Sequence, residues 1–374
     1  MKIVLDNDFK EFLQIVYNCA KNSCLRLFIV GGAVRDYYLN YPVKDFDLIL
    51  EGNAIEFSDN LPSDIKIKSV HKDFGTVKLI FKNKVFDLAS TRSESYPYSG
   101  CLPVVDKLGV NIENDVKRRD FTINSMYFEI LDNLEFNLID LVNGLSDIKE
   151  KKLKVLHNNS YIDDPTRIFR GLAFKYRFGF DFTNNDNQLI ENYLNNIDYS
   201  NMSTDRLFSV FKISLNYPFG YDLFKEIILN KYYKILTKDT LTFDFAIIDE
   251  IIEKFNFDYL KLPDFFEKLI KSPEILILSD NSFLNTFKTL SKLSDIDLAY
   301  NFYKTKNPDI LKFLKLKNTK LNITGSDLID LGCKEGRLIG QILDYILDFK
   351  LSNPETLLNK EDEINFAKTK FPLN

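Results

Sequence analysis

Residues 27–36 read LFIVGGAVRD, and this stretch decides the fold of the chain around it. Four apolar residues that end in two glycines predict a buried strand that turns sharply into a helix. Backbone N–H groups at such a turn can approach a polyphosphate closely, because glycine has no side chain to block it. Arg35 lies one turn into the predicted helix, where its guanidinium can donate to phosphate oxygens. The stretch therefore predicts a phosphate-binding turn that contains Gly31, Gly32 and Arg35.

The motif Asp45-Phe46-Asp47 follows closely in the sequence and indicates a metal site. In a strand over residues 43–50, the alternation of side chains places Asp45 and Asp47 on one face, while Phe46 points into a core. Two such carboxylates beside a triphosphate would hold divalent metal ions. A lone double glycine is usually only a turn, and a lone Asp-x-Asp is usually a solvated strand end. Their closeness in the chain favours the functional interpretation, in which Asp45 and Asp47 are catalytic metal ligands.

The composition limits the class of protein. A chain of 374 residues with 45% apolar residues is long enough for two or more domains with substantial cores. The formal net charge of −5 excludes a bulk basic surface, so a nucleic-acid partner would have to be bound by local basic patches. The four cysteines show no CxxC spacing and there are two histidines, which argues against a zinc site or a disulfide framework. We expect a cytoplasmic protein without a signal peptide or a membrane span.

The pattern of apolar residues changes near residue 145. Before it, short β-like segments alternate with helical stretches and turns, and the predicted strands cover 27–30, 45–50, 76–81, 85–89 and 136–140. After it we expect no strands, because apolar residues recur at spacings of three and four. The predicted helical stretches there include 189–197, 223–229, 243–255, 265–277, 284–303 and 338–351. The chain is therefore predicted to be α+β, with a nucleotide-handling N-terminal module and a mostly helical remainder.

A second group of polar residues, KRRDFTIN at residues 117–124, contains two arginines followed by an acid and an amide. We expect a helix here, in which Asp120 and Asn124 share one face because they lie four residues apart. Arg119 could then neutralise a triphosphate, and Asp120 or Asn124 could bind the hydroxyl groups of a sugar. The alternative is that Asp120 only caps the helix and the arginines lie in solvent.

A third group, DDPTRIFR at residues 163–170, places Pro165 at the expected first position of a helix and Asp164 at its N-cap. Capping alone would explain both residues. The spacing of Asp164, Arg167 and Arg170 also lines one side of the helix start with one acceptor and two donor groups. Such a set can hydrogen-bond the Watson–Crick edge of a base, as another nucleotide would.

Taken together, these motifs resemble those of class II tRNA nucleotidyltransferases. That family comprises bacterial and eukaryotic CCA-adding enzymes, CC-adding enzymes, A-adding enzymes and bacterial poly(A) polymerases. The matching segments, in order, are 31–36 with 45–47, 118–120, 140–147, 163–167 and, more weakly, 203–207 and 324–340. The resemblance implies a nucleotidyltransferase head of the polymerase β type with a mixed sheet, followed by an all-α neck, body and tail. The implied boundaries are 1–145 for the head, 146–210 for the neck, 211–320 for the body and 321–374 for the tail.

The resemblance also implies roles for residues at matching positions. Asp45 and Asp47 would bind two Mg²⁺ ions, one that activates the RNA 3′ hydroxyl and one that holds the triphosphate. The implied nucleotide-binding residues are Gly31, Gly32, Arg35, Arg119, Asp120, Asn124, Asp164, Arg167 and Arg170. Of these, Asp164 and Arg167 would select cytosine or adenine, so that the protein itself acts as the template. Asp87 is either a third carboxylate of the site or a polar residue at the sheet edge.

The implied activity is addition of CMP, AMP or both to the tRNA 3′ end, with CTP and ATP as substrates and pyrophosphate as a product. The alternatives are a poly(A) polymerase that adds AMP to RNA and an inactive RNA-binding relative. Residues 91–117 lie where the family has a loop linked to the switch from C to A addition, and their prolines and glycines predict an ordered, turn-rich segment. This segment does not discriminate CC, A and CCA addition. Lysine clusters at 149–154 and 312–320 could meet tRNA phosphates, and no obligatory protein partner is expected.

Overall fold

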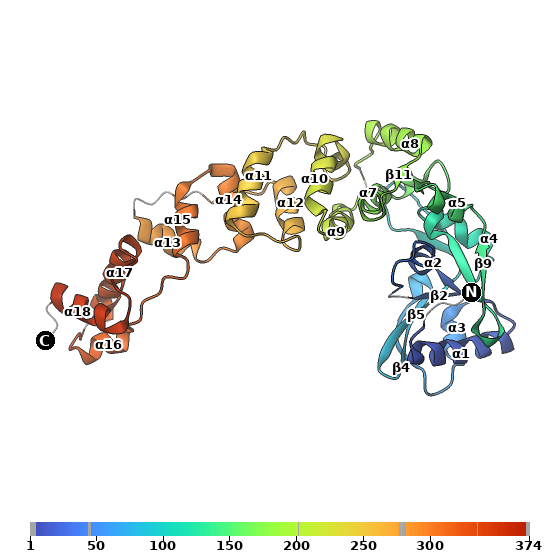
Figure 1. The fold of residues 1–374 in the computed structure, drawn as a ribbon, viewed down its shortest axis with the longest axis horizontal. Helices are drawn as coiled ribbons and strands as arrows, with labels where there is room; N and C mark the ends of the chain where they lie inside the picture. Colours follow the sequence, from blue (N-terminus) through green and yellow to red (C-terminus); the bar gives the residue numbers. More distant parts are fainter. Residues whose placement is uncertain are drawn as a thin grey trace. The chain divides into compact units, whose positions relative to one another are not determined.

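The computed structural model contains two compact units, Met1–Thr240 and Leu241–Asn374 (Figure 1). The residues that it describes are 5–43, 46–200, 202–276, 278, 282–334 and 336–371. Asp45, one of the two predicted metal ligands, lies outside the described residues. The first unit holds the sheet and the predicted site motifs. The boundaries between head, neck, body and tail stay a prediction.

A seven-stranded mixed sheet forms the core of the first unit. Its spatial order is β3-β4-β5-β2-β1-β8-β9, in which β2 and β5 are parallel and the other neighbours antiparallel. The strands are β1 (Leu27–Val30), β2 (Asp47–Leu50), β3 (Lys66–His71), β4 (Thr76–Phe81), β5 (Lys84–Ser90), β8 (Met126–Ile130) and β9 (Phe136–Asp140). The predicted α+β class with a mixed sheet is confirmed, and each predicted strand is present, although β2 begins at Asp47. The sequence pattern did not predict β3 or β8.

The turn after β1 has the conformation that its glycines predict. β1 lies in the middle of the sheet, between β2 and β8, and all of its residues are buried. The chain turns at Gly31, whose φ of +71° and ψ of −128° are readily open only to glycine. It then enters α2 (Gly32–Tyr38). The predicted strand–turn–helix is confirmed, and the buried strand fixes where the turn lies.

Two helices pack against β4 and β5, the strands on one side of β2 in the sheet. α1 (Asn7–Asn22) begins at Asp6, whose side chain accepts hydrogen bonds from backbone N–H groups of the first turn at 3.1 and 3.0 Å. Its buried Phe12 packs on β5, with ring centroids 4.1 Å from Phe86. α3 (Ala54–Ser58) packs against β4 and β5. The strands beside β2 are therefore supported by apolar burial.

Residues 91–117 form an ordered segment beside the main sheet. β6 (Arg92–Ser95) and β7 (Val104–Leu108) pair as an antiparallel hairpin. The chain continues through α4 (Ile112–Asp115), which Asn111 caps, and the 3-10 helix η2 (Val116–Arg118). η2 packs against β6, so the hairpin and the arginines that follow it lie together.

The helix predicted after the arginine pair, with Asp120 and Asn124 on one face, is wrong. The chain instead forms two 3-10 turns, η2 and η3 (Thr122–Asn124), separated by extended backbone. Phe121 is fully buried and forms a β-bridge with Val155, far along the chain. This long-range backbone pairing overrides the helical spacing of the local sequence.

The rest of the first unit is mostly helical. Its helices are α5 (Gly144–Lys149), α6 (Ser160–Asp163), α7 (Thr166–Phe178), α8 (Asn184–Asn195), α9 (Thr204–Leu215), α10 (Gly220–Leu229) and the 3-10 helix η5 (Tyr232–Ile235). The expectation of no strand after residue 145 is wrong, because β10 (Lys152–Leu153) pairs in parallel with β11 (Asp181–Phe182). Strands this short carry no periodicity that a sequence pattern could reveal.

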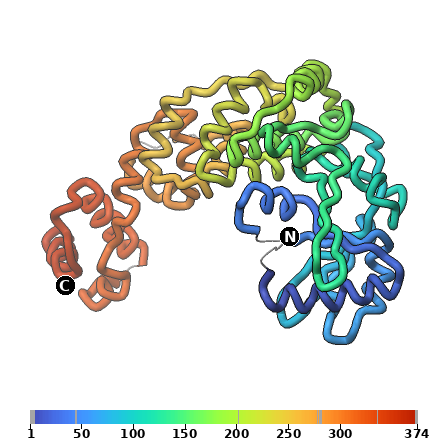
Figure 2. Tube along the Cα trace, turned by 45° about the vertical axis from the view of Figure 1, so that its right-hand side comes forward, coloured from blue at the N-terminus to red at the C-terminus, as the bar shows by residue number. Residues whose placement is uncertain are grey.

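The second unit is built from helices in the residues that the structure describes (Figure 2). They are α11 (Phe245–Lys254), α12 (Leu262–Lys271), α13 (Phe283–Leu290), α14 (Asp295–Thr305), α15 (Pro308–Leu316), α16 (Gly325–Asp330), α17 (Gly336–Ser352) and α18 (Lys360–Lys370). The single helical stretch predicted over 284–303 is two helices, because Ser294 caps α14 by accepting a hydrogen bond from the Asp297 backbone. α12 ends at Lys271, short of the predicted Ile277, which lies outside the described residues.

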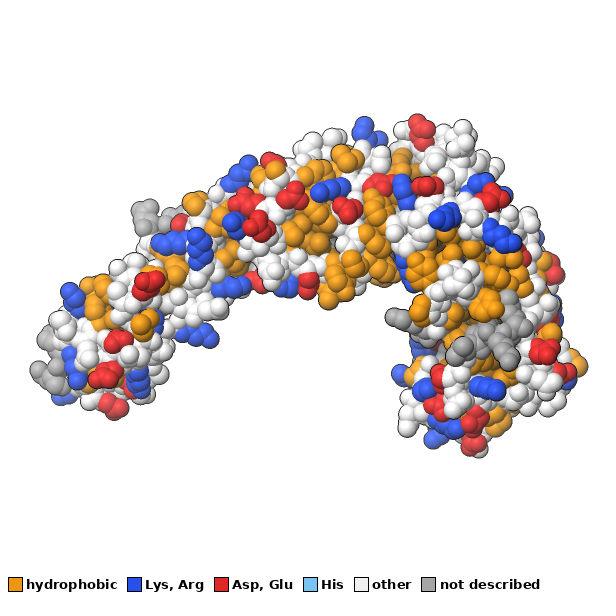
Figure 3. Space-filling model, viewed as in Figure 1, with side chains coloured by type: hydrophobic (Ala, Val, Ile, Leu, Met, Phe, Trp, Pro, Cys, Tyr) orange, Lys and Arg blue, Asp and Glu red, His pale blue; other side chains and the backbone are white. Residues whose placement is uncertain are grey.

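The surface carries no large region of one charge on the face that Figure 3 shows. Lysine and arginine side chains are interspersed with acidic ones over each unit. This agrees with the small net charge of −5. Within the described ranges, we find no helix with the length and apolar character needed to cross a bilayer.

Gly144 sets how α5 packs against η3. A Cβ atom built on Gly144 would lie 2.3 Å from the Thr122 carbonyl oxygen, which is backbone and cannot move aside cheaply. We predict that Gly144→Ala destabilises the first unit by about 1–3 kcal/mol, as overpacking of a filled site does. Chemical denaturation followed by circular dichroism measures the change.

Gly340 in α17 is the matched control, because no described atom lies within 4 Å of a Cβ built there. Gly340→Ala is expected to stabilise the second unit by up to about 1 kcal/mol through helix propensity. A Gly144→Ala protein as stable as the wild type would show that the packing of α5 tolerates the methyl group.

Candidate active site

A cleft of about 550 Å³ opens in the first unit beside the β1–α2 turn, the β6–β7 hairpin, α7 and α9. This volume falls in the range of sites for small-molecule ligands. Seven arginines and four acidic residues of the described chain line it: Arg35, Arg92, Arg118, Arg119, Arg167, Arg170, Arg206, Asp47, Glu94, Asp120 and Asp164. The lining is therefore rich in donors for an anionic ligand.

The cleft brings together the predicted site residues that the structure describes. The predicted residues that line it are Gly31, Gly32, Arg35, Asp47, Arg119, Asp120, Asn124, Asp164, Arg167 and Arg170. They come from three parts of the sequence that are well separated, 31–47, 119–124 and 164–170. The fold thus places the three polar groups singled out in the sequence around one space.

The β1–α2 turn presents bare backbone to this space. A Cβ atom at Gly31 would meet no described atom within 4 Å, and one at Gly32 would lie 3.4 Å from Arg35 Nη2. Asp47 begins β2 directly opposite Val30 in the antiparallel register, and it is exposed. The structure therefore puts an acidic residue beside the backbone of the glycine turn.

Of the two predicted metal ligands, Asp45 and Asp47, the structure describes Asp47. Among the described residues, which leave out Asp45, no group of three or more His, Cys, Asp or Glu side chains could hold a metal ion. Asp87 does not line the cleft, and its carboxylate accepts hydrogen bonds from Lys78 on β4 at 2.8 and 3.0 Å. Asp87 also lies level with Asp47, because Leu88 after it is the register partner of Leu48 in the parallel β2–β5 pair, so its role stays a prediction.

Arg35 connects three elements around the cleft. Its guanidinium donates to the Asp36 carboxylate from Nε and Nη2, at 2.8 and 2.6 Å, and from Nη1 to Asn124 Oδ1 at 2.6 Å. It also lies over the rings of Phe174 and Phe178, 5.1 and 4.6 Å from their centroids. Arg35 is only 5% exposed, so it ties α2, η3 and α7 together at the wall of the cleft.

Asp120 extends this network to the start of α7. Asn124 Nδ2 donates to Asp120 Oδ1 at 3.1 Å, and Arg170 Nε donates to Oδ2 at 3.0 Å. Burial would raise the pKa of Asp120, but the charge of Arg170 and these hydrogen bonds lower it below its usual value. Asp120 and Asn124 do share a face, although a 3-10 turn rather than an α-helix brings them together. A continuous chain of polar contacts therefore runs from Arg35 to Arg170.

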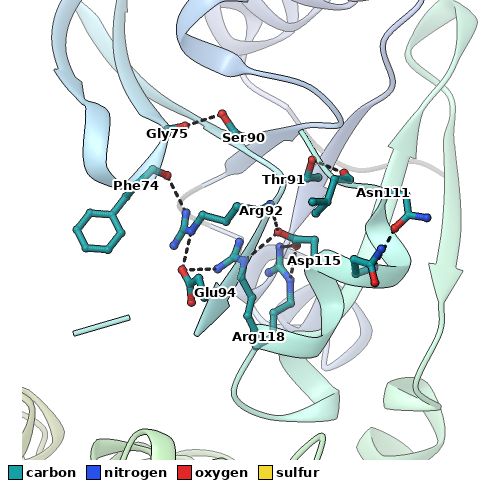
Figure 4. A network of polar contacts seen from close by, with 12 residues as sticks. Phe74, Gly75, Ser90, Thr91, Arg92, Glu94, Asn111, Asp115 and Arg118 are labelled. Carbon is teal, nitrogen blue, oxygen red and sulfur yellow. Dashed lines mark hydrogen bonds and ion pairs between the residues drawn. The ribbon is translucent and has the colours of Figure 1, made fainter. Parts of the chain in front are cut away.

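Asp115, at the end of α4, is fully buried and holds two arginines of the cleft (Figure 4). Its Oδ1 accepts hydrogen bonds from Arg118 Nε at 2.9 Å and from the Arg92 backbone N–H at 3.1 Å. Its Oδ2 accepts from Arg119 Nη2 and from the Tyr127 hydroxyl, both at 2.9 Å. Burial would raise the pKa of Asp115, but the positive charges of Arg119 and Arg118 outweigh it and lower the pKa. The carboxylate therefore stays charged and orients both guanidinium groups.

Glu94 holds the other side of the arginine cluster. Arg92 Nε donates to Glu94 at 2.6 Å, and Arg118 Nη1 lies 3.7 Å from the same carboxylate oxygen. Arg92 Nη1 also donates to the Phe74 carbonyl at 3.0 Å (Figure 4). With Asp115, two carboxylates face three arginines, so the cluster keeps a net positive charge.

Arg167, at the start of α7, is buried, and its two terminal nitrogens differ in their contacts. Its Nη2 donates to the Arg118 carbonyl at 3.0 Å. Its Nη1 has no hydrogen-bond partner within the described part of the chain. Asp164, also on the cleft wall, accepts from the Thr166 backbone at 3.1 Å. The predicted N-cap position of Asp164 is wrong by one residue, because α7 begins at Thr166 with Pro165 as its N-cap. Because a buried donor without a partner is rare in folded proteins, Arg167 marks a place where a ligand acceptor would fit.

Comparison with known proteins finds nucleotidyltransferases among the relatives of this chain. Residues 27–154 match the family described as poly A polymerase head domain. The A-adding tRNA nucleotidyltransferase of Geobacter sulfurreducens is 28% identical over 92% of this chain and 45% of its own length. That of Halalkalibacterium halodurans is 36% identical over 49% of this chain and 43% of its own. A solved structure of a CCA-adding enzyme in an apo form has a TM-score of 0.75 at 24% identity, covering 98% of this chain and 97% of that one.

The head segment and these relatives support the resemblance to class II tRNA nucleotidyltransferases. The chain spans about half the length of the curated relatives that it matches, 45% and 43% in the two cases above. The solved structure shows the fold, a mixed-sheet head followed by helices, over nearly the whole chain. The expected family resemblance is confirmed.

Four residues of this site were not singled out from the sequence. Arg92, Glu94 and Arg206 line the cleft, and Asp115 lies buried beneath the arginines. A signal existed for Asp115, which precedes Arg118 and its neighbour at the spacings of one helical face. Arg92 and Glu94 alternate on one strand, and Arg206 lies in the weakly matching segment near residue 205, but none of them carries a signal strong enough alone.

We predict that Asp115→Asn destabilises the first unit by about 3 kcal/mol near neutral pH, because it leaves buried guanidinium groups without their counter-charge. The pKa of Asp115 is lowered in the folded protein. Its contribution is therefore complete above the unfolded pKa of about 3.9 and is lost as the pH falls through the folded value. The gap in unfolding free energy between wild type and variant should shrink below about pH 4. Urea denaturation at a series of pH values measures it.

Asp87→Asn is the control for this series, because Asp87 and its partner Lys78 are both about 40% exposed and such pairs contribute little. Its stability should stay close to that of the wild type. A gap for Asp115→Asn that stays the same from about pH 6 to about pH 3 would contradict the charged state assigned to this carboxylate.

Proposed function

We propose that this chain adds nucleotides to the 3′ end of tRNA without a nucleic-acid template. The observation that carries the proposal is the lining of one cleft, where a glycine turn, the acidic Asp47 and arginines from several segments surround the unpartnered Nη1 of Arg167. A nucleoside triphosphate has both parts that this lining suits, a chain of phosphates and a base with hydrogen-bonding groups. The two curated relatives named above are A-adding tRNA nucleotidyltransferases, which supports the same assignment.

Nucleotidyltransferases of this family generally use divalent metal ions. We propose that Asp45 and Asp47 hold Mg²⁺, and the chemistry of the donors fits, because Asp47 is exposed on the cleft and Mg²⁺ prefers oxygen ligands. When bound, the metal would assist loss of the proton from the RNA 3′ hydroxyl and stabilise the charge on the departing pyrophosphate. In the overall reaction the 3′ oxygen bonds to the α-phosphorus of the nucleotide, and the bond to pyrophosphate breaks.

The chain's own groups would bind and orient the triphosphate. Backbone N–H groups at Gly31 and Gly32 can approach phosphate oxygens, because no Cβ lies in the way. Arg118 and Arg119 would supply positive charge, and Asp115 already orients both of them. A pre-oriented guanidinium loses little further conformational freedom when a ligand binds.

Asp164 and Arg167 would recognise the base. The free Nη1 donor of Arg167 can donate to an acceptor on the Watson–Crick edge. Asp164 can accept from the exocyclic amino group that adenine and cytosine both carry. Arg170, one turn further along α7, would support the site through its ion pair with Asp120.

AMP addition is the finer assignment that the curated relatives favour, since both are named as A-adding enzymes. Poly(A) synthesis is the second candidate, because the matched head domain is described by the name of poly(A) polymerase. A cytoplasmic location stays a prediction.

The function can be tested with three tRNA transcripts, ending before CC, after the first C and after CC. Each is incubated with ATP, CTP or both, and product length is measured on a gel. We expect one residue to be added to the CC-ended transcript with ATP. Extension of the shorter transcripts with CTP would assign CC or CCA addition instead. Long tails on an unrelated RNA of equal length would assign poly(A) synthesis, and no extension of any RNA would overturn the proposal.

Asp45→Asn and Asp47→Asn should each slow extension by at least about 100-fold, because each removes a charged metal ligand. Binding of tRNA, measured by gel shift, should persist in both variants. Asp132→Asn is the matched control, because Asp132 is exposed, pairs with Lys21 and lies outside the cleft, and it should extend tRNA at nearly the wild-type rate. Removal of divalent ions with a chelator should stop extension, and Mg²⁺ should restore it. Wild-type rates in the Asp47→Asn protein would refute the metal assignment.

A further inference from the structure

The carboxylate of Asp164 has most of its hydrogen-bonding capacity occupied by the protein. Oδ1 accepts from the Thr166 backbone N–H at 3.1 Å and from the Thr166 hydroxyl at 2.6 Å. Oδ2 accepts from Arg206 Nη2 at 2.7 Å. A carboxylate offers about four acceptor positions, two on each oxygen. The acceptor position that the described contacts leave open is therefore on Oδ2, and the contact with Arg206 governs its direction.

Arg206 is itself fixed by a second part of the chain. It lies in the first turn of α9, and its Nη1 donates to the carbonyl oxygens of Gly100 and Cys101 at 3.3 and 3.1 Å. Gly100 lies in the connection between β6 and β7, and its backbone N–H donates to the Asp163 carbonyl at 3.3 Å. One guanidinium thus bridges the hairpin and Asp164, with 22% of its side chain exposed.

We propose that Arg206 is a positioning residue that sets the base selectivity of the cleft through Asp164. This inference rests on the proposed function and adds to it the residue that orients the Asp164 carboxylate. With Arg206 in place, the open position on Oδ2 accepts from the amino group of adenine or cytosine. The same position repels a carbonyl oxygen, which guanine and uracil present at the corresponding place. Without Arg206, the Asp164 carboxylate is no longer held in one orientation, and the discrimination against guanine and uracil decreases.

The chemistry of the cleft supports a positioning role rather than direct binding. Both terminal nitrogens of Arg206 donate hydrogen bonds to protein acceptors, whereas Arg167 Nη1 has no partner in the described structure. Arg167 therefore supplies the donor to the base, and Asp164 the acceptor. Correct pairing needs both at a fixed separation, and Arg206 fixes one of them.

The test compares Arg206→Ala, Arg206→Lys and wild type with each of ATP, CTP, GTP and UTP on the CC-ended transcript. The preference for the best nucleotide over GTP and UTP, measured as a ratio of kcat/KM, should fall by about tenfold or more in Arg206→Ala, the scale of one charged hydrogen bond. Arg206→Lys should keep part of it, because an ammonium can reach Asp164 but cannot bridge to the hairpin as a planar fork does. Adding Arg206→Ala to Asp164→Ala should cause no further loss of preference.

Arg26→Ala is the matched control, since Arg26 also pairs with carboxylates, Glu51 and Glu129, but lies outside the cleft. Its preference among nucleotides should equal that of the wild type. A merely structural role for Arg206 would lower the melting temperature and slow all four nucleotides alike. Folded Arg206→Ala and Arg206→Lys proteins with wild-type preference would overturn the inference.

Equilibrium binding of ATP and GTP, followed by calorimetry, separates this inference from the proposed function. A wild type that adds no nucleotide but binds ATP over GTP, with the preference lost in Arg206→Ala, would overturn the function and support the positioning role. A wild type that adds nucleotides with preference while Arg206→Ala keeps the same preference would support the function and overturn the positioning role. A wild type that shows neither addition nor preferential binding would overturn both.

Discussion

The carboxylate of Asp115 is fully buried and accepts hydrogen bonds from Arg118, from Arg119 and from the backbone of Arg92. The side of the cleft proposed to bind phosphates depends on these contacts. Guanidinium groups packed together repel one another, most strongly where water is excluded. The counter-charge of Asp115, completed by Glu94 at the hairpin, holds them together. The protein thus carries a pre-arranged positive site without needing a basic surface overall.

A second polar network holds the side of the cleft proposed to bind the base. Arg35 on α2 donates a hydrogen bond to Asn124, and Asn124 donates one to Asp120. Asp120 in turn forms an ion pair with Arg170 on α7. The rings of Phe174 and its neighbour on α7 cover the Arg35 guanidinium and keep water away from it. The glycine turn and α7 are therefore linked by a network in which Arg35 and Asn124 are buried and Arg170 is exposed. The groups proposed to bind the phosphates and the base thus keep a defined relation.

Local sequence predicted β1, whose apolar residues form a short uninterrupted run, β4, whose buried residues alternate, and the helices with regular apolar spacing. It failed where distant parts of the chain compete with local preference. Phe121 bridges to Val155, so the stretch after Arg118 forms 3-10 turns and extended backbone instead of a helix. The strand β3 is an edge strand with largely exposed residues, and its polar sequence carries no burial signal.

The sequence by itself determined the glycine turn, the acidic Asp47 beside it and the polar residues that line the cleft, because these depend on residue type and short spacing. Only the tertiary structure decided how those residues are held. It assigned Asp115 to the arginines, Asn124 to Arg35 and Arg206 to Asp164, and it left one nitrogen of Arg167 unpartnered among the described residues. Such pairings join positions far apart in the chain, and only packing of the folded elements brings them within hydrogen-bonding distance.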